Sequence, residues 1–215
     1  MAYADFSLAS LRTKFQLLIT EDQKLFEAVS PIEISTSLAE LLTDNIPLAL
    51  AIDTEKARSE FIIAPLLADY RRRFKFAISL FSGVEFNVDL PRGLNGVCDF
   101  MISRSTEQLY ISAPVIMLVE AKNNRIKEGL PQCIAEMLAA RLFNEQQSNP
   151  QFAVYGVVST GSLWRFLKLE GQQVFIDQDE YHIRELAKIF GILVFMAGLD
   201  YASLEQYIGE TAKGD

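Results

Sequence analysis

The triplet Glu120-Ala121-Lys122 places a carboxylate and an ammonium two residues apart, directly after an apolar run. In a strand, residues two apart point to the same face, so both charged groups would act on one site, whereas in a helix they point well apart. The same spacing occurs at Asp22-Gln23-Lys24, within a region of helical periodicity, where it indicates only a solvated surface. The surrounding elements therefore decide what the triplet means.

A second acid, Asp99, lies in the preceding apolar segment, Val97–Ser103. A polar stretch at 104–112 separates this segment from the next apolar run, 114–120, and is typical of the tip of a hairpin. A hairpin centred on that stretch places Asp99 opposite Glu120, with Cβ atoms roughly 4.5 to 5.5 Å apart. Carboxylates at that distance repel each other, and Mg²⁺ takes hard oxygen ligands that include one or two carboxylates. We therefore expect a Mg²⁺ site here, which Mn²⁺ would also fit.

Lys122 follows Glu120 by one step on the same face of the predicted strand. An ammonium at that position would orient a water molecule or stabilise negative charge that develops on a phosphate. The alternative interpretation is a pair of polar residues at a strand exit, which is the better one for an isolated triplet.

The order of the predicted elements favours a site. Apolar residues at spacings of three and four from Thr54 to about Phe74 predict an amphipathic helix. Further on, the pattern predicts strands at 84–90, 97–103 and 114–120, a helix at 128–147, strands at 152–158, 163–169 and 173–176, and a closing helix at 181–199. The run 115–119 is apolar on both faces, as in a strand that layers cover on both sides.

These motifs in this order resemble the PD-(D/E)XK, or restriction-endonuclease-like, nuclease superfamily. The likeness covers about residues 54–158. In that family an acid on the second strand precedes a Glu/Asp-x-Lys triplet on the third, and here Gly96-Val97-Cys98-Asp99 and Glu120-Ala121-Lys122 match the two half-motifs. Cys98 replaces the proline that often precedes the first acid, a change that removes no ligand.

The resemblance implies further site residues. An acid from the first helix maps onto Glu60, a polar residue from the helix after the motif maps onto Gln132, and the main-chain carbonyl of Ala121 is implied as a metal ligand. Glu60 is equally compatible with a solvated helix residue, and Gln132 with a side chain that caps its own backbone. Glu136, one turn after Gln132, would face the same site.

The resemblance also implies an α/β fold with a restriction-endonuclease-like core. Its central mixed sheet would combine an antiparallel three-strand meander with a further strand, and helices would flank it. The helical pattern from Leu8 to about Leu50 predicts an N-terminal helical extension at 1–53, packed on a nuclease domain at 54–215. Dimers are frequent in the family, so a homo-oligomer is among the expectations.

The net charge of −8 and a sequence pI of about 4.8 argue against strong, unaided binding of nucleic acid. Local basic strips are the run at 71–73 with Lys75, and the pair Arg125 and Lys127. Two isolated cysteines and a start without a signal-peptide pattern favour the cytoplasm. The longest apolar stretch, 189–199, is too short to span a bilayer, so we expect no membrane role.

Single-residue chemistry narrows the classes of function. One histidine, His182, argues against a His-based zinc site or a Ser/His/Asp triad, and no phosphate-cradling glycine motif is present. His182 and the aromatic pair Trp164 and Phe166 are expected to be structural. The first hypothesis is a Mg²⁺-dependent nuclease that acts on nucleic acid, with DNA preferred over RNA as the expected partner. The alternatives are a catalytically inactive nuclease-like fold that acts as a binding or assembly module, and a hydrolase of small phosphate esters.

Overall fold

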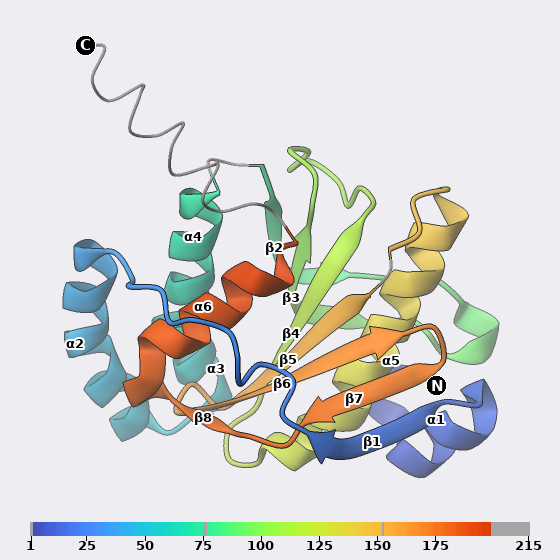
Figure 1. Ribbon diagram of the computed structural model, residues 1–215, viewed down its shortest axis with the longest axis horizontal. Helices are drawn as coiled ribbons and strands as arrows, with labels where there is room; N and C mark the ends of the chain where they lie inside the picture. Colours follow the sequence, from blue (N-terminus) through green and yellow to red (C-terminus); the bar gives the residue numbers. More distant parts are fainter. Residues whose placement is uncertain (1, 75–76, 152, 199–215) are drawn as a thin grey trace.

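A mixed sheet runs through the molecule in a computed structural model, which describes residues 2–74, 77–151 and 153–198 (Figure 1). Its strands lie in the order β1-β7-β6-β5-β4-β3-β2, and the short β8 pairs with β6. The strands are β1 (Leu18–Gln23), β2 (Ser79–Glu85), β3 (Val97–Ser103), β4 (Val115–Ala121), β5 (Val154–Ser159), β6 (Leu163–Glu170), β7 (Gln173–Asp177) and β8 (Tyr181–His182).

The strand directions bring the ends of several strands to one edge of the sheet. β2, β3 and β4 form an antiparallel meander, and β5 lies parallel to β4 after the crossover helix α5 (Ile126–Gln146). β6 and β7 follow as antiparallel neighbours, and β1 pairs with β7 in parallel. The carboxyl ends of β1, β4, β5 and β7 therefore lie at the same edge as the amino ends of β3 and β6. The expected α/β class, with a mixed sheet between helices, is confirmed.

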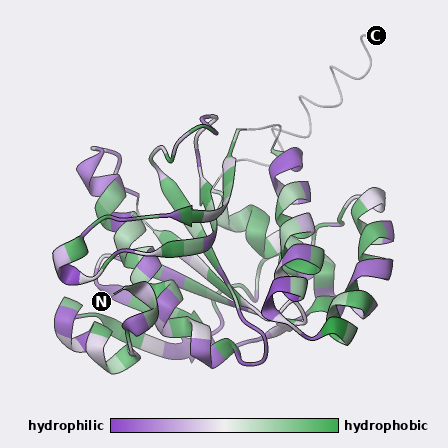
Figure 2. Cartoon of the chain, turned by 180° about the vertical axis from the view of Figure 1, so that it is seen from behind, coloured by the Kyte–Doolittle hydropathy of each residue, from purple (hydrophilic) through white to green (hydrophobic). Residues whose placement is uncertain are grey.

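Helices cover both faces of this sheet (Figure 1). One layer contains α2 (Thr36–Ile52), α3 (Glu55–Arg58), a π-helical segment (Ser59–Ile63), α4 (Ala64–Arg73) and α6 (Leu186–Met196). The other contains α1 (Leu8–Phe15) and α5, and short 3-10 turns lie at Tyr3–Asp5, Leu90–Arg92 and Ile183–Glu185. Figure 2 shows hydrophilic and hydrophobic bands on the outer helices, as expected where one face of each helix packs on the sheet.

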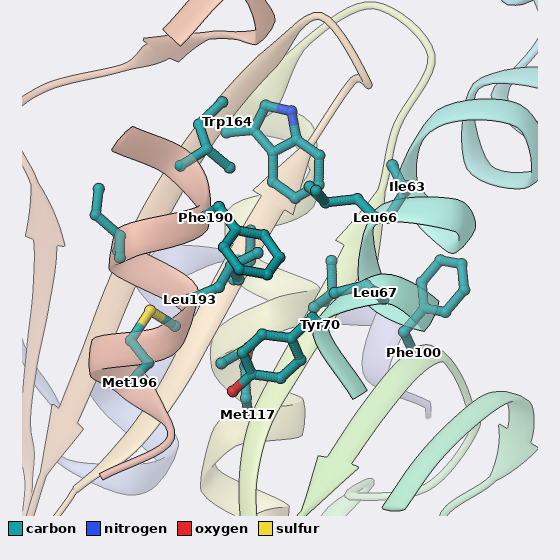
Figure 3. Close-up of a cluster of buried hydrophobic side chains, with 14 of the residues drawn as sticks. Ile63, Leu66, Leu67, Tyr70, Phe100, Met117, Trp164, Phe190, Leu193 and Met196 are labelled. Carbon is teal, nitrogen blue, oxygen red and sulfur yellow. The ribbon is translucent and has the colours of Figure 1, made fainter. Parts of the chain in front are cut away.

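Two hydrophobic cores lie on either side of the sheet. In the first, side chains of α4 and α6 meet the sheet around Trp164, which is fully buried, as Figure 3 shows for Leu66, Phe190 and Leu193. The second forms between α5 and the opposite face of the sheet, with Leu118 and Ile134 among its members. Because β4 is buried along its whole length, the apolar run of the sequence correctly indicated a strand between two layers.

The N-terminal segment differs from the expected helical extension. Residues 18–23 form strand β1, which joins the edge of the sheet beside β7, so the triplet Asp22-Gln23-Lys24 lies at a strand end and not in a helix. Most side chains of β1 are exposed, so the segment has no alternating apolar pattern that would mark a strand. Its hydrogen bonds with β7 come from tertiary structure and leave no local signal.

Three further boundaries needed correction. β2 begins at Ser79 and ends at Glu85. The alternating residues after it form a loop, in which the backbone N–H groups of Phe86 and Val88 donate to the carbonyls of Gly96 and Leu94. His182 belongs to β8 and its Nδ1 accepts a hydrogen bond from Arg184 N, so it is not a helix residue. The closing helix, expected at 181–199, begins only at Leu186, because Tyr181 and His182 form β8; its expected end, Leu199, lies outside the described residues. In the described part of the chain, no helix has the length and apolar character to cross a bilayer.

Candidate functional site

Asp99 and Glu120 adjoin the last registered pair of β3 and β4. The registered pairs Met101 with Leu118 and Phe100 with Val119 fix the ladder, and Asp99 and Glu120 are the next residues beyond it on the two strands. Asp99 Oδ2 also accepts a hydrogen bond from the backbone N–H of Ala121 at 2.8 Å. The register predicted from the polar tip is therefore confirmed.

Glu120 is a buried acid with two side-chain partners. It is only 1% exposed, its Oε1 pairs with Lys122 Nζ, and its Oε2 accepts a hydrogen bond from Gln132 Nε2 at 2.9 Å. Burial and the charge of Asp99 raise the pKa of Glu120 to about 8, although Lys122 opposes the shift. The pocket around this carboxylate thus holds more negative charge than its single ammonium balances.

Lys122 shares the face of Glu120, as strand spacing predicted. Burial alone would lower the pKa of Lys122, but the adjacent Glu120 carboxylate, with Glu55 and Asp99, outweighs it and the pKa rises. The lysine therefore keeps its proton, and its Nζ can donate to an anion near Glu120.

Gln132 links Glu120 to a second buried acid on α5. Its Nε2 donates to Glu120 Oε2 and also to Glu136 Oε1, the latter at 3.1 Å. α5 begins at Ile126, so Gln132 lies in the second turn and the interpretation of a side chain that caps its own helix is wrong. The resemblance mapped this residue to the site, and the structure places it in direct contact with Glu120.

Glu136 has no exposed surface, and its Oε2 has no hydrogen-bond partner within the described residues. Burial, reinforced by the nearby charge of Glu120, raises its pKa well above the ordinary value. The neutral acid is therefore the favoured form at this position. The expectation that Glu136 faces the site is confirmed through its contact with Gln132.

A glycine lets α5 approach the strand that carries the triplet. A Cβ at Gly129 would lie 2.7 Å from Val158 Cγ1 and 3.1 Å from Lys122 Cγ. Such distances are shorter than ordinary van der Waals contact, so a side chain would push the helix away from β4. Gly129 thus sets the distance across which Gln132 reaches Glu120.

Asp99 and Ala121 line a cleft of about 280 Å³ against the helix that begins at Glu55. Glu60 lines the same cleft, in the π-helical segment, but its half-exposed carboxylate pairs with Lys56 at 2.9 Å. Glu120 does not line this cleft, because it points toward α5. Asp99 therefore lies between an acidic cleft on one side and the Glu120–Lys122 pair on the other.

Glu55 is a member of this region that sequence reasoning did not assign to the site. It lines the cleft, and its charge influences the pKa of both Glu120 and Lys122. The available signal was its place at the helix start, five residues before Glu60, where an acid also interacts favourably with the helix dipole. Because that structural role explains an acid at this position, the sequence did not indicate that Glu55 and Asp99 line the same cleft.

Arg58 is a second residue that sequence reasoning did not assign. Its guanidinium donates to Asn123 Oδ1 at 3.1 Å and to the carbonyl of Thr160 at 2.9 Å, and it pairs with Asp53 at 2.9 Å. These contacts tie the loop after Lys122 to α3 and to the β5–β6 turn. Three segments that are distant in sequence meet at this side chain, and no local sequence pattern indicates such a contact.

The arginine cluster expected to bind nucleic acid has another role. Arg72 and Arg73 pair with the buried Asp69, and Lys75 lies outside the described residues. The helical path from Glu60 to Arg72 spans twelve residues, or roughly 18 Å. Arg72 and Arg73 therefore pair with Asp69 at the end of α4 that is distant from Glu60. Of the second pair, Arg125 lies near Glu128 at 3.8 Å, and Lys127 lines a separate pocket.

No model of a protein family, no curated protein and no solved structure matches this chain. Within the described residues, no three His, Cys, Asp or Glu side chains converge as a metal-binding group. The oxygen donors close to each other are the carboxylates of Asp99 and Glu120 with the backbone around Ala121. Function is therefore inferred from the chemistry of this small set.

Proposed function

We propose that the chain is a Mg²⁺-dependent nuclease that hydrolyses phosphodiester bonds in nucleic acid, with DNA as the first substrate to test and Mn²⁺ as a second metal. One observation carries the proposal: Asp99 and Glu120 adjoin the last registered pair of β3 and β4, while Lys122 and Gln132 both contact the Glu120 carboxylate. The antiparallel meander, crossover helix and parallel strand around them support the resemblance to restriction-endonuclease-like proteins.

The donor set suits a hard divalent cation. Asp99, Glu120 and the main-chain carbonyl of Ala121 would supply oxygen ligands, and Mg²⁺ commonly takes one or two carboxylates and completes its shell with water and substrate phosphate. The raised pKa of Glu120 supports this fit, since a cation would relieve its repulsion with Asp99. When bound, such an ion would supply positive charge to the phosphate and activate water for attack on phosphorus.

The side chains of this chain have separable tasks in the proposal. Lys122 holds a proton on Nζ and would donate it in a hydrogen bond to a phosphate oxygen or to the attacking water. Gln132 orients the Glu120 carboxylate through its amide N–H. The hydrogen bond from Ala121 N orients Asp99, so both acids would hold their positions before substrate arrives.

Substitution of Asp99 tests the proposal. The wild-type protein and Asp99→Asn are incubated with single-stranded and duplex DNA, with RNA and with a small phosphodiester, in Mg²⁺, Mn²⁺ or chelator. Wild type should cleave DNA only with metal, and Asp99→Asn should lose at least about 100-fold, as expected when one transition-state interaction is removed. Asp44→Asn, an exposed acid on α2, is the matched control. Equal metal-dependent cleavage by Asp99→Asn would contradict the assignment.

A nuclease-like binding or assembly module is the second candidate function. It is favoured by the net charge of −8 and by the existing partners of Glu120, whose two oxygens already contact Lys122 and Gln132. Calorimetric titration with Mn²⁺ separates the two candidates. A saturable heat that Asp99→Asn abolishes supports the nuclease, whereas no saturable heat in wild type supports the module.

A further inference from the structure

Glu120 and Arg165 lie in one row across the sheet. Val158 of β5 is the registered partner of Glu120 in β4 and of Arg165 in β6. Registered partners on neighbouring strands point to the same face, and neighbouring strands lie about 4.8 Å apart. The backbone of Arg165 is therefore about 10 Å from that of Glu120, on the face that α5 covers.

A pocket of about 380 Å³ opens beside Arg165, between α1, the start of α5 and β1. Three cationic side chains line it, namely Arg12, Lys127 and Arg165, against two acids, Glu21 and Glu180. Apolar residues, among them Leu130 and Ile176, complete its wall. An excess of positive charge at this place contrasts with the acidic balance of the whole chain.

The guanidinium of Arg165 has hydrogen-bond capacity that the protein does not use. Its Nε donates to the carbonyl of Asp177 at 2.9 Å. Its Nη1 lies 3.6 Å from Glu180 and its Nη2 lies 3.8 Å from Glu21, which are ion-pair distances longer than a hydrogen bond. The side chain is 16% exposed, so its terminal N–H groups can also donate to a further anion that enters the pocket.

A second cation of the pocket has no partner in the described part of the protein. Lys127 is exposed and makes no hydrogen bond or ion pair with any residue in the described ranges. The Arg165 guanidinium and the Lys127 ammonium, which line the same pocket, form a donor set suited to a phosphate group.

We propose that this pocket binds a backbone phosphate of the nucleic acid strand that enters the site of Glu120. The inference rests on the proposed nuclease function and adds the path of the substrate, which runs from Glu120 over the start of α5 to Arg165. The separation of about 10 Å between the two backbones places the contacted phosphate close along the strand to the bond that is cleaved. This pocket replaces the distant arginine cluster of α4 as the electrostatic contact to substrate.

Equilibrium binding of a fluorescein-labelled DNA duplex, measured by anisotropy with Ca²⁺ in place of Mg²⁺, tests the proposal. Lys127→Ala and the double variant Arg12→Ala/Lys127→Ala should weaken binding. The log of the association constant should also fall less steeply with the log of the salt concentration, by about 0.9 in slope for each phosphate that the variant no longer neutralises. Lys168→Ala is the matched control, because Lys168 lies on the same strand as Arg165 but faces the opposite side of the sheet.

A gain in affinity provides a second measurement that misfolding does not imitate. Glu180→Gln removes an acid that competes for Arg165, so this variant should bind the duplex more tightly than wild type, by about 2- to 5-fold. Asp179→Asn, an acid at the adjacent position that does not line the pocket, should not change affinity.

The outcomes separate this inference from the proposed function. Weaker binding by Lys127→Ala and tighter binding by Glu180→Gln, with unchanged controls, support the pocket. Metal-dependent cleavage by wild type, together with equal affinity in all pocket variants, overturns the pocket and leaves the nuclease proposal standing. If wild type neither binds nor cleaves DNA or RNA, both proposals fail.

Discussion

Gln132 Nε2 donates a hydrogen bond to Glu120 Oε2 across 2.9 Å, so helix α5 directly stabilises the charged form of the acid on β4. Gln132→Leu removes that donor, and the pKa of Glu120, already raised to about 8, should rise further. We expect the acidic limb of the pH profile of Mg²⁺-dependent cleavage to move to higher pH, measured as kcat/KM. Gln146→Leu, an exposed amide on the same helix, should leave the limb in place. An unmoved limb in Gln132→Leu would show that the contact has no electrostatic effect.

Metal binding should release a proton from Glu120. At about pH 7 the carboxyl is mostly protonated, because its pKa is raised to about 8, and a cation must displace that proton to reach the oxygen. Titration with Mn²⁺ in two buffers of different ionisation enthalpy should report about one proton released per ion. The number of protons released per ion should fall toward zero at a pH well above the pKa of Glu120. Asp44→Asn, at an exposed acid on α2, should retain the release, and identical heats in both buffers for wild type would count against Glu120 as a ligand.

Glu136 should make the metal-free protein less stable as pH rises. Its pKa is raised above the ordinary value of 4.5, so the folded state binds this proton more tightly than the unfolded chain. The resulting stabilisation is complete below about pH 4.5 and is lost as pH climbs toward the folded-state pKa. Glu136→Gln keeps an acceptor for Gln132 and removes the ionisation.

Urea unfolding at about pH 5 and about pH 9, in chelator, measures this effect. The unfolding free energy of wild type should fall by about 1 to 3 kcal/mol more than that of Glu136→Gln between these values. Glu145→Gln, a half-exposed acid on the same helix, is the control and should follow wild type. An equal change in unfolding free energy between the two pH values for wild type and Glu136→Gln would mean that Glu136 has the same proton affinity in the folded and unfolded states.

The pair at Asp99 and Glu120 was predictable from sequence because its geometry is local. A polar tip sets the midpoint of a hairpin, and a fixed side-chain period then determines which residues face each other. Strands β3 and β4 and the crossover helix were predictable for the same reason, whereas the alternating residues that predicted the first strand lie mostly in the loop after β2. Gln132 required the family resemblance, because nothing in its own helix indicates that its amide turns toward the strand.

The remaining features depend on contacts between distant segments. β1 is an edge strand whose identity comes from β7, and Arg58 gains its role from turns more than sixty residues away. The arginines at the end of α4 had the composition of a nucleic-acid contact, but the buried Asp69 requires their charge. Arg165 carries no signal in the sequence, and only the strand order places it in the row of Glu120.

Gly129 offers the sharpest test of how α5 and β4 work together. In Gly129→Ala the new Cβ would meet Val158 Cγ1 at 2.7 Å and Glu120 Cγ at 3.3 Å. Alanine favours a helix over glycine by about 1 kcal/mol, whereas overpacking costs about 1 to 3 kcal/mol, so the net loss in unfolding free energy should be small. Displacement of α5 should nevertheless separate Gln132 from Glu120.

We therefore expect cleavage by Gly129→Ala to fall at least about 10-fold, well beyond its change in stability, because misplacement of a site by a fraction of an ångström is costly. Urea unfolding and kcat/KM are measured on the same preparation. Glu128→Ala, the neighbouring exposed position, should retain activity because its side chain points away from the strand. If Gly129→Ala were more stable than wild type and fully active, the close approach of helix and strand would have no part in holding Gln132 against Glu120.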